Sequence, residues 1–258
     1  MEGLESAWVR TIVSASSDSR IGRSVIAAGK LKFRFKGNVN EIICTVDVAL
    51  LTIQNDSLNV ALLKREREPF KGVYALPGGY IHPEEDLDAR DAAVRVLRDK
   101  TGIVAPYLEQ LASFSGAARD PRGWSVSLTY YALVSFRVIE EAGHPGIRLC
   151  NVDKLRSLPF DHREIIETAV ARLRSKSQYS SLPCHLAGTE FTLPQLQRIY
   201  EALMGEALNK VSFRRKMDEM DILRPITGKM EGGAHRPAQL YELRPEFRHR
   251  LGLLERGL

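Results

Sequence analysis

The stretch LPGGYIHPEEDLDARDAAVRVLRDKTGI, residues 76–103, decides the fold of this chain. It opens with adjacent glycines and then carries apolar residues at helical spacing: Ala89, Ala93, Val96 and Leu97. Thr101 and Gly102 end the helical pattern, because glycine readily takes the left-handed conformation at a helix C-terminus. The segment therefore predicts a loop, a helix over residues 86–100 and a second loop.

Strand patterns flank this helix on both sides. Residues 42–53 and 58–64 are rich in aliphatic side chains, and the polar turn between them predicts a β-hairpin. Residues 108–115 predict a further short strand. Beyond them, strict alternation places one set of side chains on a common strand face: Val126, Leu128, Tyr130, Ala132, Val134 and Phe136.

A second helix is predicted at residues 161–174. Asp161 is expected to cap it, and Glu164 completes a capping-box arrangement ahead of an apolar stripe. Mixed strands enclosed by two helices are typical of an α+β domain. We expect this domain to span roughly residues 40–175.

The pattern changes near residues 175–183, SKSQYSSLP, which are polar and end in proline. This composition suits a linker. Beyond it, Thr192 and Gln195 predict a capped helix that Gly205 interrupts.

A second short helix is opened by Asn209, with Phe213, Met217 and Met220 at helical intervals. Residues 223–227, a glycine-rich tip and the closing strand AQLYEL follow it. Helix, turn, helix and hairpin is the order of a winged helix-turn-helix domain. We place this domain at residues 179–258, together with a C-terminal tail.

Composition limits the class of protein. The chain has 258 residues, 44% hydrophobic, 27% charged, and a net charge of +5, which is ordinary for a globular protein and favours a polyanionic partner. No apolar run approaches the roughly 18 residues of a membrane span, and the first residues lack a secretory signal. We expect a cytoplasmic protein with no membrane partner. The scattered Cys44, Cys150 and Cys184 predict packing roles.

Residues 1–40 are expected to form an N-terminal extension. Within it, LKFRFK at residues 31–36 alternates apolar and basic side chains. This pattern indicates an edge strand whose charges discourage aberrant pairing. The alternative interpretation is a basic face that contacts DNA phosphates.

The loop, helix and loop of residues 76–103 resemble the Nudix box of hydrolases that split nucleoside diphosphates linked to another group. In that family, glutamates on one helix face hold magnesium, which neutralises the pyrophosphate and activates water. The glycines let the backbone approach the ligand closely, and an arginine orients one glutamate. The resemblance implies a mixed-sheet α/β/α sandwich, which we place at residues 41–178.

The chain departs from this box at the positions that carry the chemistry. Aligned on Gly102, it keeps the family's arginine as Arg95, but Val96 replaces the first glutamate. Asp99 and Lys100 occupy the paired-glutamate positions. Valine cannot ligate a metal, and lysine places a positive charge in the site. We therefore expect no catalytic residue, no metal ligand and no required cofactor.

The features around the box favour ligand binding instead of hydrolysis. The segment EPFKGVYALPGG and the loop RDPRGW resemble the surroundings of the ligand in ADP-ribose-recognising Nudix domains. Arginines suit a diphosphate, and Phe70, Tyr74 or Trp124 can stack on adenine. The candidate effector-binding residues are Arg65, Phe70, Gly78, Gly79, Arg95, Lys100, Asp120 and Arg122.

The second helix of the C-terminal domain combines an apolar face with a basic one. A supporting helix followed by such a helix suits insertion into the major groove of DNA, and a wing can neutralise phosphates. The candidate DNA-binding residues are Lys210, Ser212, Arg214, Arg215, Lys216, Lys229, His235 and Arg236. Nearby acidic residues dilute this charge, and a solvated helical face is the alternative.

The combination of a damaged Nudix box with a winged helix resembles the NrtR family, Nudix-related transcriptional regulators of NAD metabolism. The specific parts are VDVALLTI, EPFKGVYALPGG, DPRGW, FDHREII and the FRRKM helix. The resemblance implies a homodimeric repressor that binds palindromic operators of NAD biosynthesis or salvage genes. It also implies ADP-ribose or a related NAD derivative as effector.

Alternative functions remain open from the sequence. The chain could be an active Nudix hydrolase of ADP-ribose-type substrates, a sugar-sensing Nudix-winged-helix regulator, or a structural scaffold. Val96 separates the first alternative from a sensor, because hydrolysis needs the metal that valine cannot hold. Glu84, Glu85, Asp91 and Asp99 would be either a loose metal site or a solvated acidic surface.

Overall fold

The computed structural model describes residues 25–27, 30–35, 38–232, 237–248 and 251–253. Its centre is the long strand β3 (Asn38–Gln54), which runs parallel to β8 (Ser125–Leu133) along one edge. Along its other edge β3 pairs antiparallel with β2 (Lys30–Phe35), β6 (Gly78–Tyr80) and β4 (Ser57–Lys64). The outer strands are β1 (Val25–Ala27) on β2, β5 (Tyr74–Ala75) and β9 (Ile147–Asn151) on β4, and β7 (Tyr107–Gly116) on β8.

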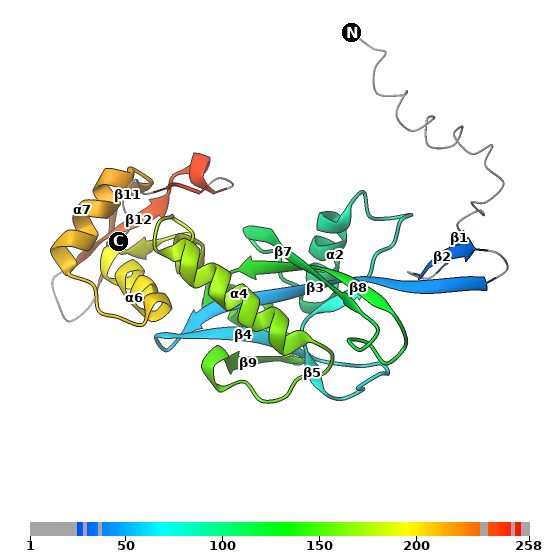
Figure 1. Ribbon diagram of the computed structural model, residues 1–258. Helices are drawn as coiled ribbons and strands as arrows, with labels where there is room; N and C mark the ends of the chain where they lie inside the picture. Colours follow the sequence, from blue (N-terminus) through cyan, green and yellow to red (C-terminus); the bar gives the residue numbers. More distant parts are fainter. Residues whose placement is uncertain (1–24, 28–29, 36–37, 233–236, 249–250, 254–258) are drawn as a thin grey trace, which may run out of the picture.

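Helices cover both faces of this mixed sheet (Figure 1). Helix α2 (Ala89–Thr101) packs Val96 and Leu97 against one face, and α4 (His162–Ser177) packs Ile165 and Ile166 against the other. Asp88 caps α2, and Gly102 ends it with a φ of 72°. The α/β/α sandwich and the helix within residues 76–103 are therefore confirmed.

The strand predicted from alternation ends earlier than expected. Helix α3 (Phe136–Ala142) begins where the pattern was expected to continue, so Phe136 lies in a helix. The opposite face of β8 is also fully buried, because α4 covers it: Ser125, Ser127, Thr129, Tyr131 and Leu133 are its residues. Alternating hydrophobicity fails as a signal in a strand that is covered on both sides.

The start of α4 also differs from the expectation. Asp161 is the N-cap residue, but its side chain makes no capping hydrogen bond. Its carboxylate instead accepts two hydrogen bonds from Arg119, at 2.8 Å and 2.9 Å. The capping-box prediction is wrong here, because a long-range ion pair holds the carboxylate that would have made it.

The C-terminal elements form a winged helix. Helix α6 (Leu193–Met204) carries the expected capping box of Thr192 and Gln195, and α7 (Lys210–Met220) begins after the N-cap Asn209. A small sheet orders β10 (Phe191–Thr192), β12 (Ala238–Leu243) and β11 (Leu223–Glu231). The short helices are α5 (Cys184–Ala187), η1 (Val152–Lys154) and η2 (Pro245–Phe247). These elements confirm the predicted helix-turn-helix and wing.

The linker predicted at residues 175–183 is wrong, because much of it is buried. Ser180, Ser181 and Leu182 have no solvent-exposed surface. Ser181 and Gly252 exchange hydrogen bonds of 2.8 Å in each direction, and the Tyr200 hydroxyl donates to the Ser180 carbonyl at 3.0 Å. Serine can be buried when its polar atoms find partners inside the protein. The polar composition of this segment therefore did not indicate a solvated chain.

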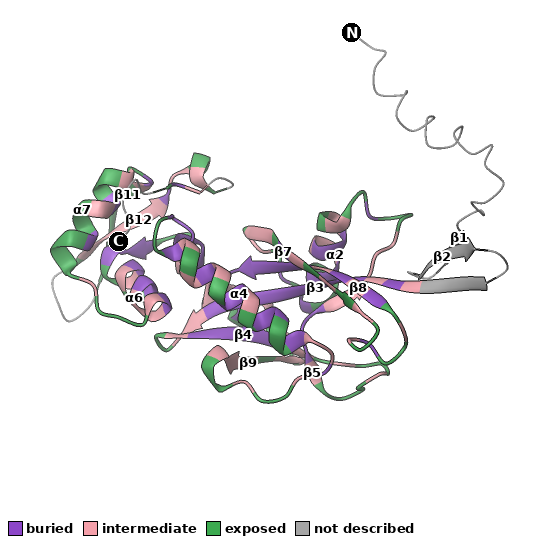
Figure 2. Cartoon of the chain, viewed as in Figure 1, coloured by how far each residue is buried: buried purple, intermediate pink, exposed green. Residues whose placement is uncertain are grey.

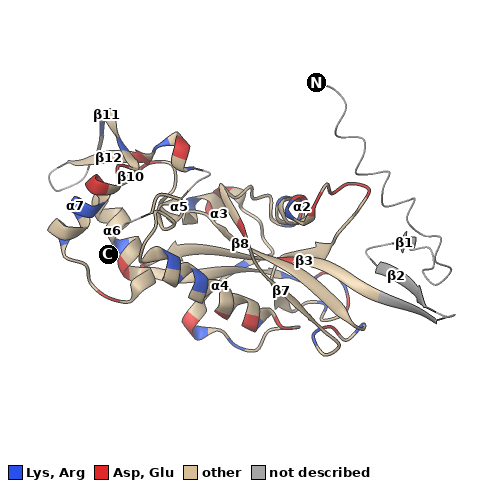
Figure 3. Cartoon of the chain, turned by 45° about the horizontal axis from the view of Figure 1, so that its top comes forward, with Lys and Arg blue, Asp and Glu red and all other residues tan. Residues whose placement is uncertain are grey.

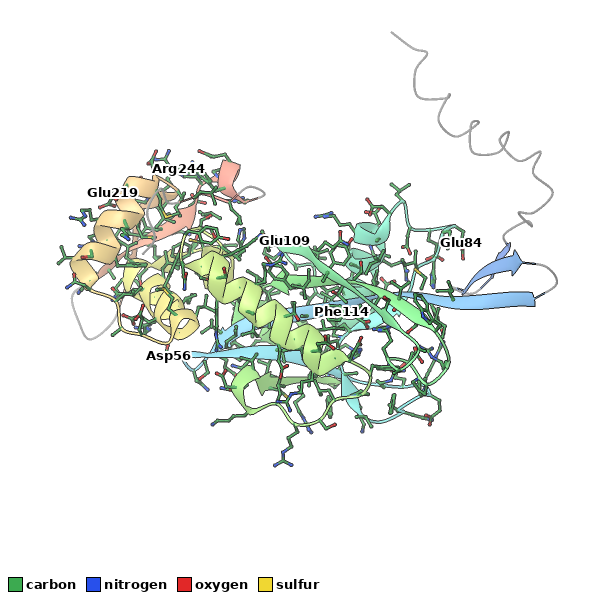
Figure 4. All side chains as sticks on the ribbon, in the orientation of Figure 1. Asp56, Glu84, Glu109, Phe114, Glu219 and Arg244 are labelled. Carbon is green, nitrogen blue, oxygen red and sulfur yellow. The ribbon has the colours of Figure 1, made fainter. Side chains whose placement is uncertain are left out.

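One hydrophobic core crosses this junction. Leu182, Leu186, Ile199 and Leu203 belong to the same buried cluster as the side chains of β3, β4 and α4. In Figure 2 buried residues, in purple, continue from the strands of the sheet to α4 and α6. Asp56, in the β3–β4 turn, adds an exposed ion pair with Arg198 of α6 at 3.8 Å, and Figure 4 places it at the end of the sheet beside the winged helix. The sandwich and the winged helix are thus packed directly on each other.

Three further expectations concern membrane spans, the basic edge strand and the cysteines. No helix among the described residues is long and apolar enough to cross a membrane. Residues 30–35 of the expected basic edge strand form β2, which pairs with a strand on each side and is therefore not an edge. The cysteines are free thiols, of which Cys184 is buried in the winged-helix core.

Candidate functional site

The loop of the damaged box lies directly on the central strand. Gly78 pairs with Asp47 of β3, and a Cβ atom at position 78 would stand 1.9 Å from the Asp47 carboxylate. Only glycine fits this approach without moving Asp47. The Leu76 amide donates to Nδ1 of His162 at 3.0 Å, which ties the loop to the first residue of α4. The loop glycines therefore bring the backbone onto a buried polar cluster.

This polar cluster is centred on Asp47. Its carboxylate accepts a 2.7 Å hydrogen bond from Ser127, and it lies 3.6 Å from Arg119 and 3.5 Å from His162. Burial alone raises the pKa of Asp47, but His162, Ser127 and Arg119 together lower it to about 2. Arg119 in turn holds Asp161. The cluster therefore joins β3, β8, the loop after β7 and the start of α4.

Arg122 is held in place at the edge of this cluster. The buried Asp120 accepts bonds from its guanidinium at 2.9 Å and 2.6 Å, and from its backbone amide at 2.9 Å. The other end of the guanidinium donates to the Tyr80 hydroxyl at 2.6 Å and lies over the Tyr80 ring. Because one third of the Arg122 side chain is exposed, its charge is both fixed in direction and accessible.

The mouth of the site is formed by Arg65, Phe70 and Lys100. Arg65 donates to the Pro69 carbonyl at 2.8 Å and lies 4.8 Å from the centre of the Phe160 ring. Phe70 meets the same ring edge-on at 5.0 Å and is 38% exposed. The Lys100 ammonium donates to the Gly78 carbonyl.

The cations at this mouth are electrostatically coupled. Desolvation lowers the pKa of Lys100, and the charges of Arg65 and Arg67 lower it too, whereas Asp47 raises it. Desolvation and the neighbouring Arg122 likewise lower the pKa of Arg65. Positive charges that disfavour one another in the free protein are arranged for an anionic ligand, which would relieve the repulsion.

Arg95 does not join this group. Its guanidinium is bound at 2.6 Å and 2.8 Å by Asp86, and at 3.0 Å by the Tyr80 carbonyl. Its side chain is only 17% exposed. The structure therefore brings Arg65, Phe70, Gly78, Lys100, Asp120 and Arg122 together, whereas Arg95 braces the loop behind them.

The side chains on α2 do not fit the magnesium of the Nudix box. Val96 is buried beneath Gly79, within 2.9 Å of where a Cβ would stand. Asp99 pairs with Arg98 at 3.0 Å, and Lys100 occupies the remaining position with a positive charge. Among the described residues no group of three or more His, Cys, Asp or Glu side chains could hold a metal ion. A divalent cation needs several oxygen ligands, and this surface does not supply them.

A second candidate surface lies on α7. Phe213 and Met217 are buried, while Lys210, Ser212, Arg214 and Arg215 are exposed and Lys216 is partly exposed. The acidic residues that dilute the charge lie in the second half of the helix or beyond it. In Figure 3 the blue (Lys, Arg) and red (Asp, Glu) parts of the α7 ribbon lie at different positions along the helix. Asp221 is the C-cap residue and is bound by Arg244.

The structure describes the wing only in part. Lys229 of β11 is exposed and pairs with Glu190 at 2.6 Å. His235 and Arg236 lie outside the described residues. The wing positions are therefore placed only at Lys229.

Several residues of the Nudix-type site were not candidates from the sequence. Asp47, His162, Tyr80 and Phe160 lie far apart in the chain and meet only through the sheet and the start of α4, where they join Arg119 of the loop RDPRGW. Asp47 carried one local signal, a charged residue inside the apolar run of residues 42–53. A buried charge within a strand indicates a partner elsewhere in the fold.

Comparisons with known proteins agree with this division. Residues 45–172 match the family model of the NUDIX domain, and residues 183–243 match the NrtR DNA-binding winged helix domain. The chain thus has the architecture of a Nudix domain joined to a DNA-binding winged helix.

Relatives define the family more narrowly. The chain is 42% identical over 202 residues to the ADPR responsive transcriptional repressor NtrR of Acinetobacter baylyi, covering 76% of this chain and 80% of that repressor. The structure of Shewanella oneidensis NrtR in complex with a 27mer DNA is 36% identical, with a TM-score of 0.77 over 83% of this chain and 99% of that one. The chain belongs to the NrtR family. The match to the ADP-ribose pyrophosphatase of Methanocaldococcus jannaschii is 32% identical over 117 residues, 45% of this chain and 67% of that enzyme.

Proposed function

We propose that this protein is a transcriptional repressor that binds ADP-ribose, or a related NAD derivative, in its Nudix domain and DNA through its winged helix. The genes it controls are those of NAD biosynthesis or salvage. The names of its relatives support this choice, since one responds to ADPR and another was solved with DNA. The observation that carries it is the group of mutually repelling cations Arg65, Lys100 and Arg122 near Gly78. The loop that holds Gly78 is hydrogen-bonded, through the Leu76 amide, to His162 at the start of α4.

The diphosphate of the ligand binds between Arg65, Lys100 and Arg122. Lys100 donates to the Gly78 carbonyl, the charges of Arg65 and Arg122 act on each other, and Asp120 fixes the direction of Arg122. Phe70 stacks on the base, because its exposed ring is already held by Phe160. Gly78 and Gly79 keep the loop close to the sheet, and Arg95 supports the loop without touching the ligand.

Binding needs no metal, and the bound diphosphate is not hydrolysed. Val96 and Lys100 remove the oxygen ligands that magnesium requires. The Lys100 ammonium supplies part of the positive charge that the metal brings in hydrolases. A fixed cation stabilises the diphosphate, but it activates no water.

Helix α4 carries the response to the winged helix. Its first residues contact the cluster under the ligand through Asp161 and His162. Its other end packs on α6, within the shared core. A ligand shifts DNA affinity only if it binds two arrangements of the protein unequally. A small displacement of Arg119 or of the Gly78 loop changes the position of α4, and α4 changes that of α6.

On DNA the protein acts as a cytoplasmic homodimer on a palindromic operator. Helix α7 of each subunit enters the major groove, with half-sites about one helical turn apart. We keep residues 41–178 as the effector-binding domain and 179–258 as the DNA-binding domain, with residues 1–40 as an extension. Wing residues, among them Lys229, contact phosphates beside the groove.

A mobility-shift experiment tests this function. Duplexes from upstream regions of neighbouring genes are bound at about 0.15 M salt, a physiological ionic strength. ADP-ribose, NAD and simple sugars are added in turn, each with excess EDTA. ADP-ribose or NAD is expected to change the DNA affinity under these conditions. A response to sugars alone, or release of AMP from ADP-ribose in a parallel assay with magnesium, would contradict the proposal.

Lys100→Glu tests the built-in charge. In EDTA, the rise in melting temperature caused by ADP-ribose should shrink or vanish, because a negative charge now faces the diphosphate. Lys154→Glu makes the same charge change on the exposed helix η1 and should leave the ligand response unchanged. An undiminished response of Lys100→Glu would remove Lys100 from the site.

A further inference from the structure

An exposed apolar side chain stands among the polar residues of α7. Val211 is 78% exposed, whereas Phe213 and Met217 of the same helix pack inward. It lies in the first turn, where its backbone amide donates to the Asn209 side chain at 3.0 Å. A β-branched side chain in a helix is nearly limited to one rotamer. Val211 therefore presents its methyl groups to solvent in a fixed direction.

The charges along α7 define which part of the helix approaches DNA. Lys210, Arg214 and Arg215 lie in its first half, whereas the exposed Asp218 and Glu219 lie in its second half. Glu219 also forms an ion pair with Arg215 at 3.5 Å, and Figure 4 shows Glu219 near the C-terminal end of the helix. Carboxylates repel phosphates, so the first half enters the groove and the second half stays outside. Val211 is thus in the part that meets the bases.

The major groove offers one apolar group to such a side chain. Each base pair presents donors and acceptors there, and thymine alone adds a methyl group, at C5. Lys210 and Ser212, which flank Val211, are polar and suited to phosphates and to base edges. We propose that Val211 contacts the 5-methyl group of a thymine in each half-site and makes the protein prefer thymine at that position. This inference rests on the proposed DNA-binding function.

Replacement of thymine by deoxyuridine tests the contact directly. A duplex is first selected by the full-length protein from a library whose random segment spans about three helical turns. Each thymine is then changed to deoxyuridine, which removes only the methyl group, and affinity is measured for the wild type and for Val211→Ala. Replacing one particular thymine in each half-site should lower the affinity of the wild-type protein for the duplex about fourfold, which corresponds to the burial of about one CH₂ group. At the same thymine, Val211→Ala should show no further loss.

The control variant separates this result from an effect on folding or on charge. Val104→Ala removes the same atoms from a valine that is 67% exposed in the Nudix domain, and it should keep the wild-type profile. Melting temperatures of both variants should match the wild type, because neither valine is buried. If Val211→Ala loses affinity at every deoxyuridine just as the wild type does, or if no thymine matters to either protein, the inference is wrong. Failure to select any duplex would instead overturn the DNA-binding function on which it rests.

Discussion

Arginine serves opposite purposes at the two ends of this molecule. At the Nudix site, Arg119 and Arg95 are 7% and 17% exposed and each is held by a carboxylate. On α7, Arg215 is 70% exposed and forms an ion pair of 3.5 Å with Glu219 of its own helix. Arginines fixed in the interior hold the surrounding loops in place, so the geometry of a site for one small ligand is set before binding. Exposed charges suit a long polyanion, since they adapt to its phosphates and depend on salt.

The largest effect is expected from removing a buried partner. Asp161→Ala leaves Arg119 with Asp47 as its remaining carboxylate at 3.6 Å. Breaking a buried pair in this way costs about 3–5 kcal/mol of unfolding free energy. Glu167→Ala removes the partner of Arg163, whose side chain is 57% exposed, and should cost less than about 1 kcal/mol. Urea unfolding of both variants measures the difference, and equal losses would show that the two kinds of pair are not distinct.

An intermediate effect is expected from acid. The folded pKa of Asp47 is lowered from 3.8 to about 2, so its contribution to stability is complete above the unfolded value and is lost as pH falls toward 2. This difference corresponds to about 2 kcal/mol. Asp47→Asn should therefore flatten the fall in unfolding free energy between about pH 4 and pH 2. A slope in Asp47→Asn as steep as that of the wild type would contradict the buried cluster.

The smallest effect is expected on the exposed side. Lys210→Ala should weaken binding to all duplexes alike, by less than about tenfold, and reduce the slope of log affinity against log salt by about 1. Lys154→Ala, at an exposed lysine far from α7 in the chain, should change neither quantity. A loss confined to one sequence would mean that Lys210 reads a base instead of neutralising a phosphate.

The features that the sequence predicted are those that depend on interactions between residues close together in the chain. Periodicity and local signals located α2 with its end at Gly102, the capping box of α6 and the core face of α7. These depend on neighbours within a turn or two of helix. The cations Arg65, Lys100 and Arg122 followed from the resemblance, and the structure brings them together near one loop.

The errors came from interactions between distant segments. Asp161 stands at the position of a capping residue, but its carboxylate accepts hydrogen bonds from Arg119 instead. For the candidate Arg95, the sequence did not show that Asp86 and the Tyr80 carbonyl bind its guanidinium donors. The serines of residues 175–183 have a linker's composition, and their burial depends on partners as far away as Gly252. Composition does not report such partners, because each is settled by the packing of the whole chain.

The core shared across the junction also limits how the protein can move. Ile199 and Leu203, on α6, are 8% and 1% exposed, and a hinge that swung the winged helix away would bring both into water. Exposing each of these side chains to water would cost about 1.5–3 kcal/mol. This cost is comparable to the free energy by which a ligand typically favours one conformation over another. A shear movement keeps side chains buried while packed helices slide by small steps. The transition between the ligand-bound and DNA-bound forms is therefore expected to be a slide of α6 along α4, with both domains left intact.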